Sequence, residues 1–248
     1  MRAGILHRDL SPNNIMYRIV REKNAEGVVE DKVYGVLMDF DLSSWTKDIK
    51  EDYSKTSQQR TGTPPFMAHG LLGGSDLLHL YRHDLESLLY VMLILATHYE
   101  IQPSTEKEEG GLRVRQGLDE LPYQLWFGQP TYKALAHYKR GFFSNLEDLD
   151  LSPTFKDLHD WLWDLRLSFR KGIRGRDIHE ESAALRRRQG GVSEKGAIPE
   201  FDYETLGGYA DYSTFINPVS KLKGKLRGLI VRYDPSLSTS TAQVDAGR

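Results

Sequence analysis

The chain has 248 residues, of which 39% are hydrophobic and 27% are charged, and its formal net charge at pH 7 is −2. This balance is typical of a globular protein, and it excludes a chain that is disordered over most of its length. The near-neutral charge excludes a general attraction to nucleic acid or to an anionic membrane, and the absence of cysteine excludes disulfides and thiolate metal sites.

Two β-favouring runs lie near the N-terminus, at residues 15–20 and 33–40. The charged segment 21–32 contains glycine and separates them, which predicts a β-hairpin with an enlarged loop. Residues 42–60 are polar and show neither helical nor alternating periodicity, so we expect a long surface loop there.

Two later segments have the apolar spacing of helices. Residues 85–96 are apolar on nearly all sides, which predicts a buried central helix preceded by Asp84. A second, amphipathic helix is expected to start after Pro153. Residues 172–196 contain few large apolar side chains and many Arg, Glu and Gly residues, which favours a solvated linker or insertion.

The location of the protein is expected to be intracellular, either cytoplasmic or nuclear. The few residues before His7 leave no room for a signal peptide, and the absence of cysteine fits a reducing compartment. The longest apolar run, residues 85–96, is interrupted by Glu86 and is too short to cross a bilayer. We therefore expect neither a membrane nor a nucleic-acid partner.

Residues 7–14 read His-Arg-Asp-Leu-Ser-Pro-Asn-Asn and match the pattern HRDLxxxN of protein kinases at every specified position. Phosphoryl transfer requires a carboxylate beside the attacking hydroxyl and an amide oxygen that holds a metal on the phosphates. Asp9 and Asn14 fit these two roles. The alternative is that Asp9 caps a turn and that Asn13 and Asn14 are ordinary loop residues after Pro12.

A second carboxylate follows a predicted strand. Asp39 comes directly after Val36, Leu37 and Met38, at the position where kinases present the magnesium-binding Asp of their DFG triplet. Magnesium prefers oxygen ligands, so Asp39, Asn14 and a nucleotide form a consistent shell. Asp41 replaces the usual glycine of the triplet and adds a charge where kinases normally have backbone freedom.

Residues 61–68 read Thr-Gly-Thr-Pro-Pro-Phe-Met-Ala and resemble the segment that closes the activation loop of kinases. His69 and Gly70 follow where kinases have Pro and Glu. The ion pair of that Glu with a later Arg therefore cannot form, and either another contact anchors the segment or the segment is loose. The resemblance implies that Thr63 faces the catalytic Asp and favours Ser or Thr substrates.

Ser54, Thr56 and Ser57 lie where regulatory phosphates often occur in kinases, with Arg8 as a phosphate partner. The alternative is that these hydroxyls only keep the loop soluble. Residues 82–88 resemble the start of the kinase central helix, which implies that Asp84 accepts amide hydrogen bonds from the catalytic loop. Asp84 can also be an N-cap, and both roles can coexist.

Together the segments HRDLSPNN, LMDFD, GTPPFMA and HDLESLLYV resemble the fungal-type protein kinase family, which favours Ser after HRDL and DFD in place of DFG. Residues 201–212 resemble the closing segment of that family. The resemblance implies an α+β fold, namely the mainly helical C-terminal lobe of a protein kinase with a short β-hairpin beside the catalytic loop. It also implies a phosphotransferase that uses Mg²⁺ and ATP to phosphorylate Ser or Thr hydroxyls of proteins.

The resemblance assigns a role to each candidate residue. The expected catalytic residues are His7, Arg8, Asp9, Ser11 and Thr63. Asn14 and Asp39 are expected to bind the metal and the nucleotide, and Asp84 and Phe40 to support the site. Ser11 replaces the lysine that neutralises the γ-phosphate in most Ser/Thr kinases, so that part of the transition-state stabilisation is missing or supplied elsewhere.

The family resemblance and the composition together predict that the chain has four parts. Residues 1–172 form the kinase lobe, 173–199 a charged linker or insertion, 200–234 the closing segment with a short extension, and 235–248 a disordered tail. Nothing before His7 matches a glycine-rich loop, a lysine-bearing strand or a helix bearing its Glu partner. We therefore expect the N-terminal lobe to be absent, and weak Mg-ATP binding and very low activity from these residues alone.

Two other functions remain open. One is a catalytically inactive kinase-like interaction module, which keeps Asp84 and the core but binds no Mg-nucleotide. The other is a small-molecule phosphotransferase of the aminoglycoside or choline type, which shares the metal-binding Asn and Asp. Arg8, where those enzymes usually have Gly, and the GTPPFMA segment disfavour the second alternative.

Overall fold

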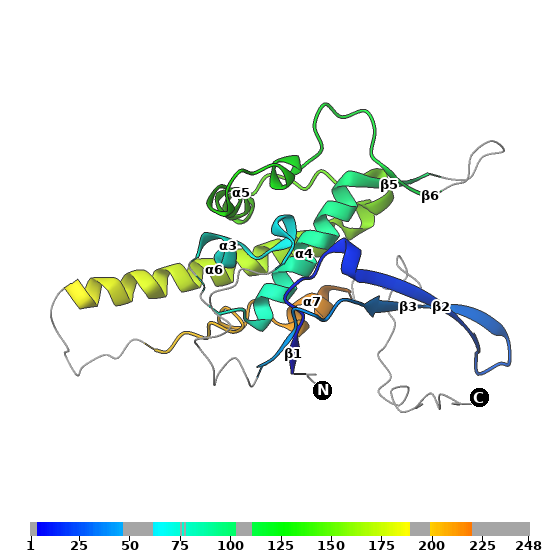
Figure 1. The fold of residues 1–248 in the computed structure, drawn as a ribbon, viewed down its shortest axis with the longest axis horizontal. Coiled ribbons are helices and arrows are strands. Elements are labelled where there is room, and N and C mark those ends of the chain that lie inside the picture. Colours follow the sequence, from blue (N-terminus) through cyan, green and yellow to red (C-terminus); the bar gives the residue numbers. More distant parts are fainter. Residues whose placement is uncertain are drawn as a thin grey trace, which may run out of the picture.

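A computed structural model of the protein describes residues 4–46, 62–74, 76, 78–102, 111–188 and 199–219. The fold is α+β, with helices gathered on one side and a two-stranded ribbon extending away from them (Figure 1). In chain order the elements are β1 (Ile5–Leu6), the 3-10 helix η1 (Pro12–Asn14), β2 (Ile15–Lys23), β3 (Val29–Leu37), β4 (Ser44–Trp45), η2 (Pro64–Phe66), α3 (His69–Gly73), α4 (Tyr81–His98), β5 (Tyr99–Gln102), β6 (Gly111–Val114), η3 (Gln124–Phe127), α5 (Tyr132–Ser144), η4 (Pro153–Leu158), α6 (His159–Arg188) and α7 (Tyr212–Val219).

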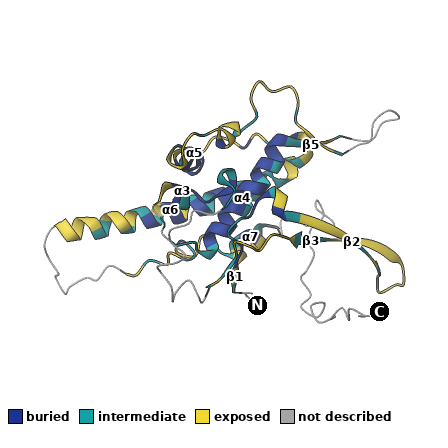
Figure 2. Cartoon of the chain, in the orientation of Figure 1, coloured by how far each residue is buried: buried dark blue, intermediate teal, exposed yellow. Residues whose placement is uncertain are grey.

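Helix α4 is the centre of the core, as its apolar sequence predicts. Leu89, Tyr90 and Leu93 are fully buried, and α4 is dark along its length in Figure 2. The helix begins at Tyr81, earlier than predicted, and its N-cap is Leu80, so the alternative role of Asp84 as an N-cap is wrong. Among the described residues, no helix combines the length and the apolar character of a membrane span.

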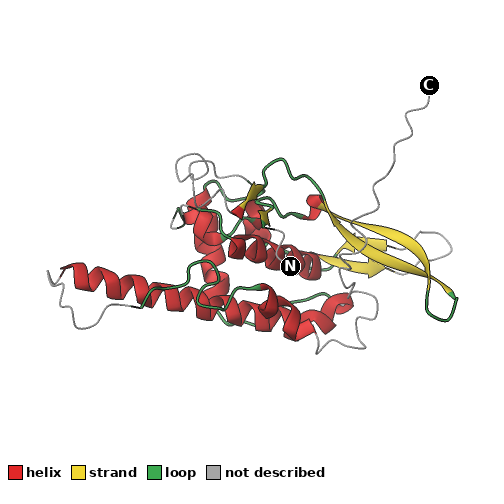
Figure 3. Ribbon diagram, turned by 90° about the horizontal axis from the view of Figure 1, so that it is seen from below, coloured by secondary structure: helices red, strands yellow, loops and turns green. Residues whose placement is uncertain are grey.

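The predicted hairpin is present, but its strands are longer and its loop is shorter than expected. Each strand has nine residues, and the register runs from Ile15 opposite Leu37 to Lys23 opposite Val29. The charged residues assigned to a loop instead pair across the strands. Arg21 contacts Asp31 at 3.1 Å, and Lys32 contacts Glu22 at 2.7 Å. These pairs are exposed and each contributes little to stability, but they show that the charged residues lie in strands of the ribbon, which extends from the helices in Figure 3.

Helix α6 continues to Arg188, so the start of the expected linker at residue 173 falls inside a helix. Arg and Glu are good helix formers, so a charged segment with few apolar residues can continue a helix. Ile173 and Arg176 are buried, and Arg176 reaches Asp76 at 3.2 Å. Residues 189–198 and the expected tail 235–248 lie outside the described residues.

Residues 201–219, the described part of the expected closing segment, pack back onto α6. The indole N–H of Trp161 donates to the carbonyl of Phe215 at 2.9 Å, and the hydroxyl of Ser168 donates to the carbonyl of Tyr209 at 2.8 Å. Leu206 is fully buried against this helix. A Cβ atom added at Gly172 would lie only 2.6 Å from the Cβ of Leu206, so glycine is required there for close approach.

We expect Gly172→Ala to lower the free energy of unfolding by about 1–3 kcal/mol, because the added methyl group overpacks the contact with Leu206. Gly175→Ala is the matched control in the same helix, since its added Cβ would lie 3.6 Å from the ring of Phe201, an ordinary contact. Urea unfolding followed by tryptophan fluorescence measures both variants. Equal stability of the two would contradict a tightly docked closing segment.

Candidate active site

Two residues, Thr63 and Asn14, form hydrogen bonds to the carboxylate of Asp9. The backbone N–H and the hydroxyl of Thr63 both donate to Asp9 Oδ1, each at 2.8 Å. The side-chain amide of Asn14 donates to the Asp9 carbonyl at 2.8 Å and to Asp9 Oδ2 at 3.3 Å. Segments 54 residues apart in sequence therefore orient one carboxylate.

Gly62 allows this approach of the two segments. Its φ angle is +120°, a conformation that residues with a Cβ rarely adopt. A Cβ atom there would lie 3.0 Å from the carbonyl oxygen of Arg8 and 3.7 Å from Asp9 Oδ1. Glycine thus brings the segment that contains Thr63 against residues 7–14, the candidate catalytic loop.

Asp84 in α4 holds the backbone of the candidate catalytic loop. Its Oδ2 accepts the N–H of His7 at 2.7 Å, and its Oδ1 accepts the N–H of Arg8 at 3.0 Å and Nε2–H of His79 at 2.8 Å. Burial raises the pKa of Asp84, but His79 and the two backbone amides outweigh it and leave the pKa lowered. These bonds maintain the left-handed φ of +72° at Arg8, a strained value for a residue other than glycine.

His7 connects residues 7–14 to the segment that contains Asp39. Its Nδ1 accepts the N–H of Asp9 at 3.4 Å, and its Nε2–H donates to the carbonyl of Met38 at 2.8 Å. The N–H of Met38 in turn donates to the carbonyl of Asn14 at 2.9 Å. The ring of Phe40 lies 4.8 Å from that of His7. Asp39 therefore directly follows a residue that is bonded to Asn14.

The donor atoms of Asn14 and Asp39 suit a magnesium ion. The amide nitrogen of Asn14 donates hydrogen bonds to Asp9, so the amide oxygen is the atom that can coordinate a metal. Asp39 is exposed and makes no side-chain hydrogen bond to another described residue. Within the described part of the chain, no three His, Cys, Asp or Glu side chains are grouped to hold a metal. A metal here would need further oxygen ligands, which phosphate groups provide.

The remaining candidate residues differ in their surroundings. Ser11 is 2% exposed, whereas Phe40 is 46% exposed. The Nε atom of Arg8 is buried and has no hydrogen-bond partner among the described residues. Burial lowers the pKa of Arg8, and the carboxylate of Asp84 opposes this shift. The candidate phosphorylation sites Ser54, Thr56 and Ser57 lie outside the described residues.

The segment after Thr63 is anchored rather than loose. The backbone N–H of His69 and its ring Nδ1–H both donate to Glu86 Oε1, at 2.7 and 2.8 Å, and the Tyr90 hydroxyl donates to the same oxygen at 2.5 Å. Burial raises the pKa of Glu86, but His69 and Tyr90 together lower it to about 2. The sequence carried a signal of this contact, because Glu86 interrupts a buried apolar run and a buried charge needs a partner.

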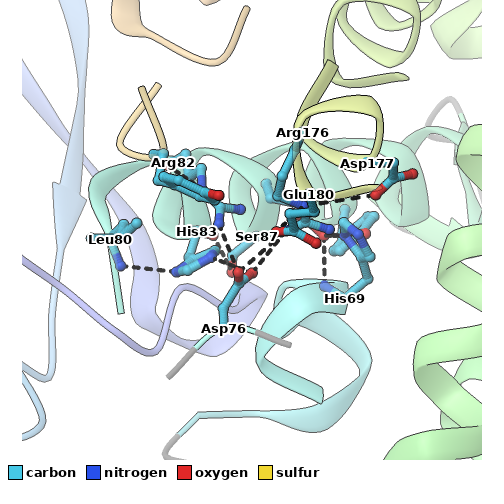
Figure 4. Close-up of polar contacts among 12 residues, drawn as sticks. His69, Asp76, Leu80, Arg82, His83, Ser87, Arg176, Asp177 and Glu180 are labelled. Carbon is cyan, nitrogen blue, oxygen red and sulfur yellow. Dashed lines mark hydrogen bonds and ion pairs between the residues drawn. The ribbon is translucent and has the colours of Figure 1, made fainter. Parts of the chain in front are cut away.

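A second buried cluster joins the start of α4 to α6 through Asp76 (Figure 4). Arg82 Nη2 lies 3.0 Å from Asp76 Oδ1, an ion pair by distance whose geometry is not that of a hydrogen bond. Arg176 Nη1 lies 3.2 Å from the same oxygen. Arg82 Nε also donates to the carbonyl of Tyr203 at 2.7 Å, which ties the closing segment to α4. Nothing in the sequence pattern marked Asp76.

His83 completes this cluster as a neutral imidazole. Its Nδ1 accepts the N–H of Leu80 at 2.9 Å, so the ring proton is on Nε2, which donates to Asp76 Oδ2 at 3.1 Å. Burial and the charge of Arg82 lower the pKa of His83 to about 3. Protonation would place another positive charge beside two buried arginines.

We expect the protein to lose stability as the pH falls from about 6.5 towards 3, partly because of His83. In this range the unfolded chain binds a proton at this histidine and the folded chain does not, so the stability rises with pH. One proton corresponds to about 1.4 kcal/mol per pH unit. Unfolding of the wild type and of His83→Gln across this range measures the effect. An unchanged slope in the variant would show that His83 is not the group responsible.

Comparison with known proteins identifies the first part of the chain. Residues 1–96 match the model of the family described as fungal protein kinase. The matched range contains residues 7–14, Asp39, Thr63 and Asp84, and the match confirms the resemblance to this family over residues 1–96. No curated protein and no solved structure matches the chain.

Proposed function

We propose, on the premise that residues 1–96 are those of a fungal protein kinase, that this chain carries the catalytic and metal-binding segments of a protein Ser/Thr kinase. Such an enzyme transfers the γ-phosphoryl group of ATP to a hydroxyl group of a protein. The observation that carries the proposal is the convergence of Thr63 and Asn14 on the carboxylate of Asp9.

In the proposed reaction, Asp9 orients the attacking hydroxyl and accepts its proton as the oxygen–phosphorus bond forms, while ADP leaves. Thr63 occupies Asp9 Oδ1 with two hydrogen bonds, so Oδ2 is the oxygen that can receive the substrate hydroxyl. Asn14 also lies at Oδ2, at 3.3 Å, and limits its rotation. The contact of Thr63 with this carboxylate supports a hydroxyl amino acid as the substrate.

Asn14 and Asp39 would hold Mg²⁺ through oxygen atoms. When bound, the metal neutralises negative charge on the phosphate oxygens. His7 keeps these two ligands in a common frame, because it bonds both the Asp9 amide and the Met38 carbonyl. Ser11 has no charge to replace the usual lysine and is almost fully buried, so we assign it no contact with phosphate.

Magnesium-dependent nucleotide binding tests the proposal. We expect Mg-ATP to raise the thermal midpoint of the wild type more than ATP or Mg²⁺ alone, because only the folded state binds the complex. A ligand at ten times its Kd stabilises by roughly 1.4 kcal/mol. Asp39→Asn is expected to lose the magnesium-dependent part of the shift. Asp41→Asn, which changes an exposed acid two residues later, is the matched control and should keep it.

Two outcomes would contradict the proposal. If millimolar Mg-ATP leaves the wild-type midpoint unchanged, the chain does not bind the nucleotide at that concentration, and the metal and nucleotide roles proposed for Asn14 and Asp39 fail. If Asp39→Asn and Asp41→Asn respond alike, Asp39 is not the metal ligand. Incubation of the protein with labelled ATP and a library of Ser, Thr and Tyr peptides then tests the reaction and the choice of hydroxyl.

A further inference from the structure

A fully buried lysine lies on the inner face of helix α5. Lys139 has no exposed side-chain surface, and Leu135, Phe142 and Phe143 on the same face of the helix are also buried. An apolar residue at this position would fit the pattern of an amphipathic helix. Burial of a charged group is unfavourable unless it is bonded, so the partners of this ammonium group are informative.

The ammonium group of Lys139 points to the backbone of the segment that follows Thr63. Its Nζ donates to the carbonyl of Met67 at 2.5 Å and lies 3.4 Å from the carbonyl of Pro64. It also lies 4.1 Å from the centre of the Tyr90 ring and 5.3 Å from that of Trp126. The carbonyl oxygens and the aromatic faces replace water around the cation.

One turn of 3-10 helix separates Lys139 from the candidate catalytic carboxylate. The two carbonyls that it contacts belong to the first residue of η2 and to the residue after its end. The N–H groups of Phe66 and Met67 donate to the carbonyl of Thr63 at 2.9 and 3.2 Å. Thr63 then donates twice to Asp9 Oδ1. A continuous series of hydrogen bonds thus joins helix α5 to the site.

We propose that Lys139 is a positioning residue, which fixes the η2 turn and, through Thr63, the orientation of the Asp9 carboxylate. The part of this inference that concerns catalysis rests on the function proposed above, whereas the anchoring of the turn does not. In this protein the amino group of Lys139, which donates to two backbone carbonyls, and the His69–Glu86 pair together anchor the segment whose usual acidic residue is absent.

A role in packing alone does not account for a lysine here. Burial lowers the pKa of Lys139 well below its ordinary value, and Glu86 opposes this shift only in part. A methionine of similar length would avoid that desolvation, but it would leave the carbonyl of Met67 without its donor. The amino group therefore serves the backbone of the turn.

Amide hydrogen exchange tests the anchoring without any need for catalysis. In Lys139→Met we expect the amides of Thr63, Phe66 and Met67 to exchange at least about tenfold faster, with those in the middle of α4 unchanged. Lys133→Met is the matched control, because Lys133 is an exposed lysine of the same helix. Lys139→Gln, which keeps an N–H donor but no charge, is a second variant if the methionine variant does not fold.

A chemical rescue separates the ammonium group from the effects of substitution. The protein contains no cysteine, so Lys139→Cys has a single thiol that can be alkylated in denaturant before refolding. Aminoethylation restores an ammonium group at nearly the length of lysine and is expected to return slow exchange at Thr63 and Met67. Ethylation, which adds no amine, is expected to leave exchange fast.

The kinetic readout tests positioning. Compared with the wild type, we expect Lys139→Met to lower kcat for peptide phosphorylation about tenfold or more and to leave the KM for ATP unchanged. Exchange at the wild-type rate in Lys139→Met would overturn the anchoring. Fast exchange with an unchanged kcat would overturn the link to Asp9. If the wild type transfers no phosphate, the proposed kinase function fails, while the exchange data still decide whether Lys139 anchors the turn.

Discussion

Replacing Asp9 by asparagine is expected to lower the rate of phosphoryl transfer by about 10²–10⁴-fold and to leave the fold intact, as is usual for loss of a general base. Asparagine retains an oxygen that can accept both hydrogen bonds of Thr63, so the local geometry survives. It cannot take a proton from a hydroxyl group. The other carboxylate oxygen becomes an NH2 group, which cannot accept from Asn14. The side-chain amide of Asn14 still donates to the backbone carbonyl of residue 9, and this limits the structural effect.

Initial rates of peptide phosphorylation at saturating Mg-ATP measure this change, and a thermal unfolding curve shows whether the variant is folded. Asp31→Asn removes an exposed charge in the β2–β3 ribbon and is expected to change the rate less than about threefold, since surface substitutions away from a site have small effects. If the rate of the Asp9→Asn variant lies within tenfold of the wild-type rate, Asp9 is not the general base.

Asp76→Ala is expected to have the largest effect on stability, a loss of about 3–5 kcal/mol, because it leaves buried charges without their partner. Arg82 and Arg176 are nearly inaccessible to solvent, and both lie within 3.2 Å of Asp76. Burial raises the pKa of Asp76, but His83, Arg82 and Arg176 outweigh it and hold the pKa far below its usual range. The stabilisation is thus present above about pH 4 and decreases in stronger acid.

Urea unfolding at pH 7.5 measures the effect, with Asp31→Ala as a control for loss of an exposed ion pair. Asp31 and its partner Arg21 are both exposed, and such pairs contribute little. A double variant, Asp76→Ala with Arg176→Met, should be more stable than Asp76→Ala alone, because it also removes an unpaired charge. A loss below about 1 kcal/mol in the single variant would show that water or another group solvates the arginines.

Only part of the fold followed from the sequence. The apolar run that became α4 and the two strands were predicted, because periodicity reports which faces are buried. The charged residues 21–32 and 173–188 were misassigned for a common reason. A run of charged residues predicts a loop when the partners of those residues are not known. The partners lie on the neighbouring strand, as for Arg21 and Asp31, or on another part of the chain, as for Arg176 and Asp76.

The sequence by itself determined the candidate chemistry, because phosphoryl transfer demands particular side chains at particular spacings, and residues 7–14 supply Asp9 and Asn14 in that pattern. The tertiary structure decided how these groups are held. Lys139 is a residue that a sequence pattern assigns to solvent, yet it is fully buried. Whether a charge is solvated or paired depends on groups distant in the chain, and only the folded arrangement brings those groups together.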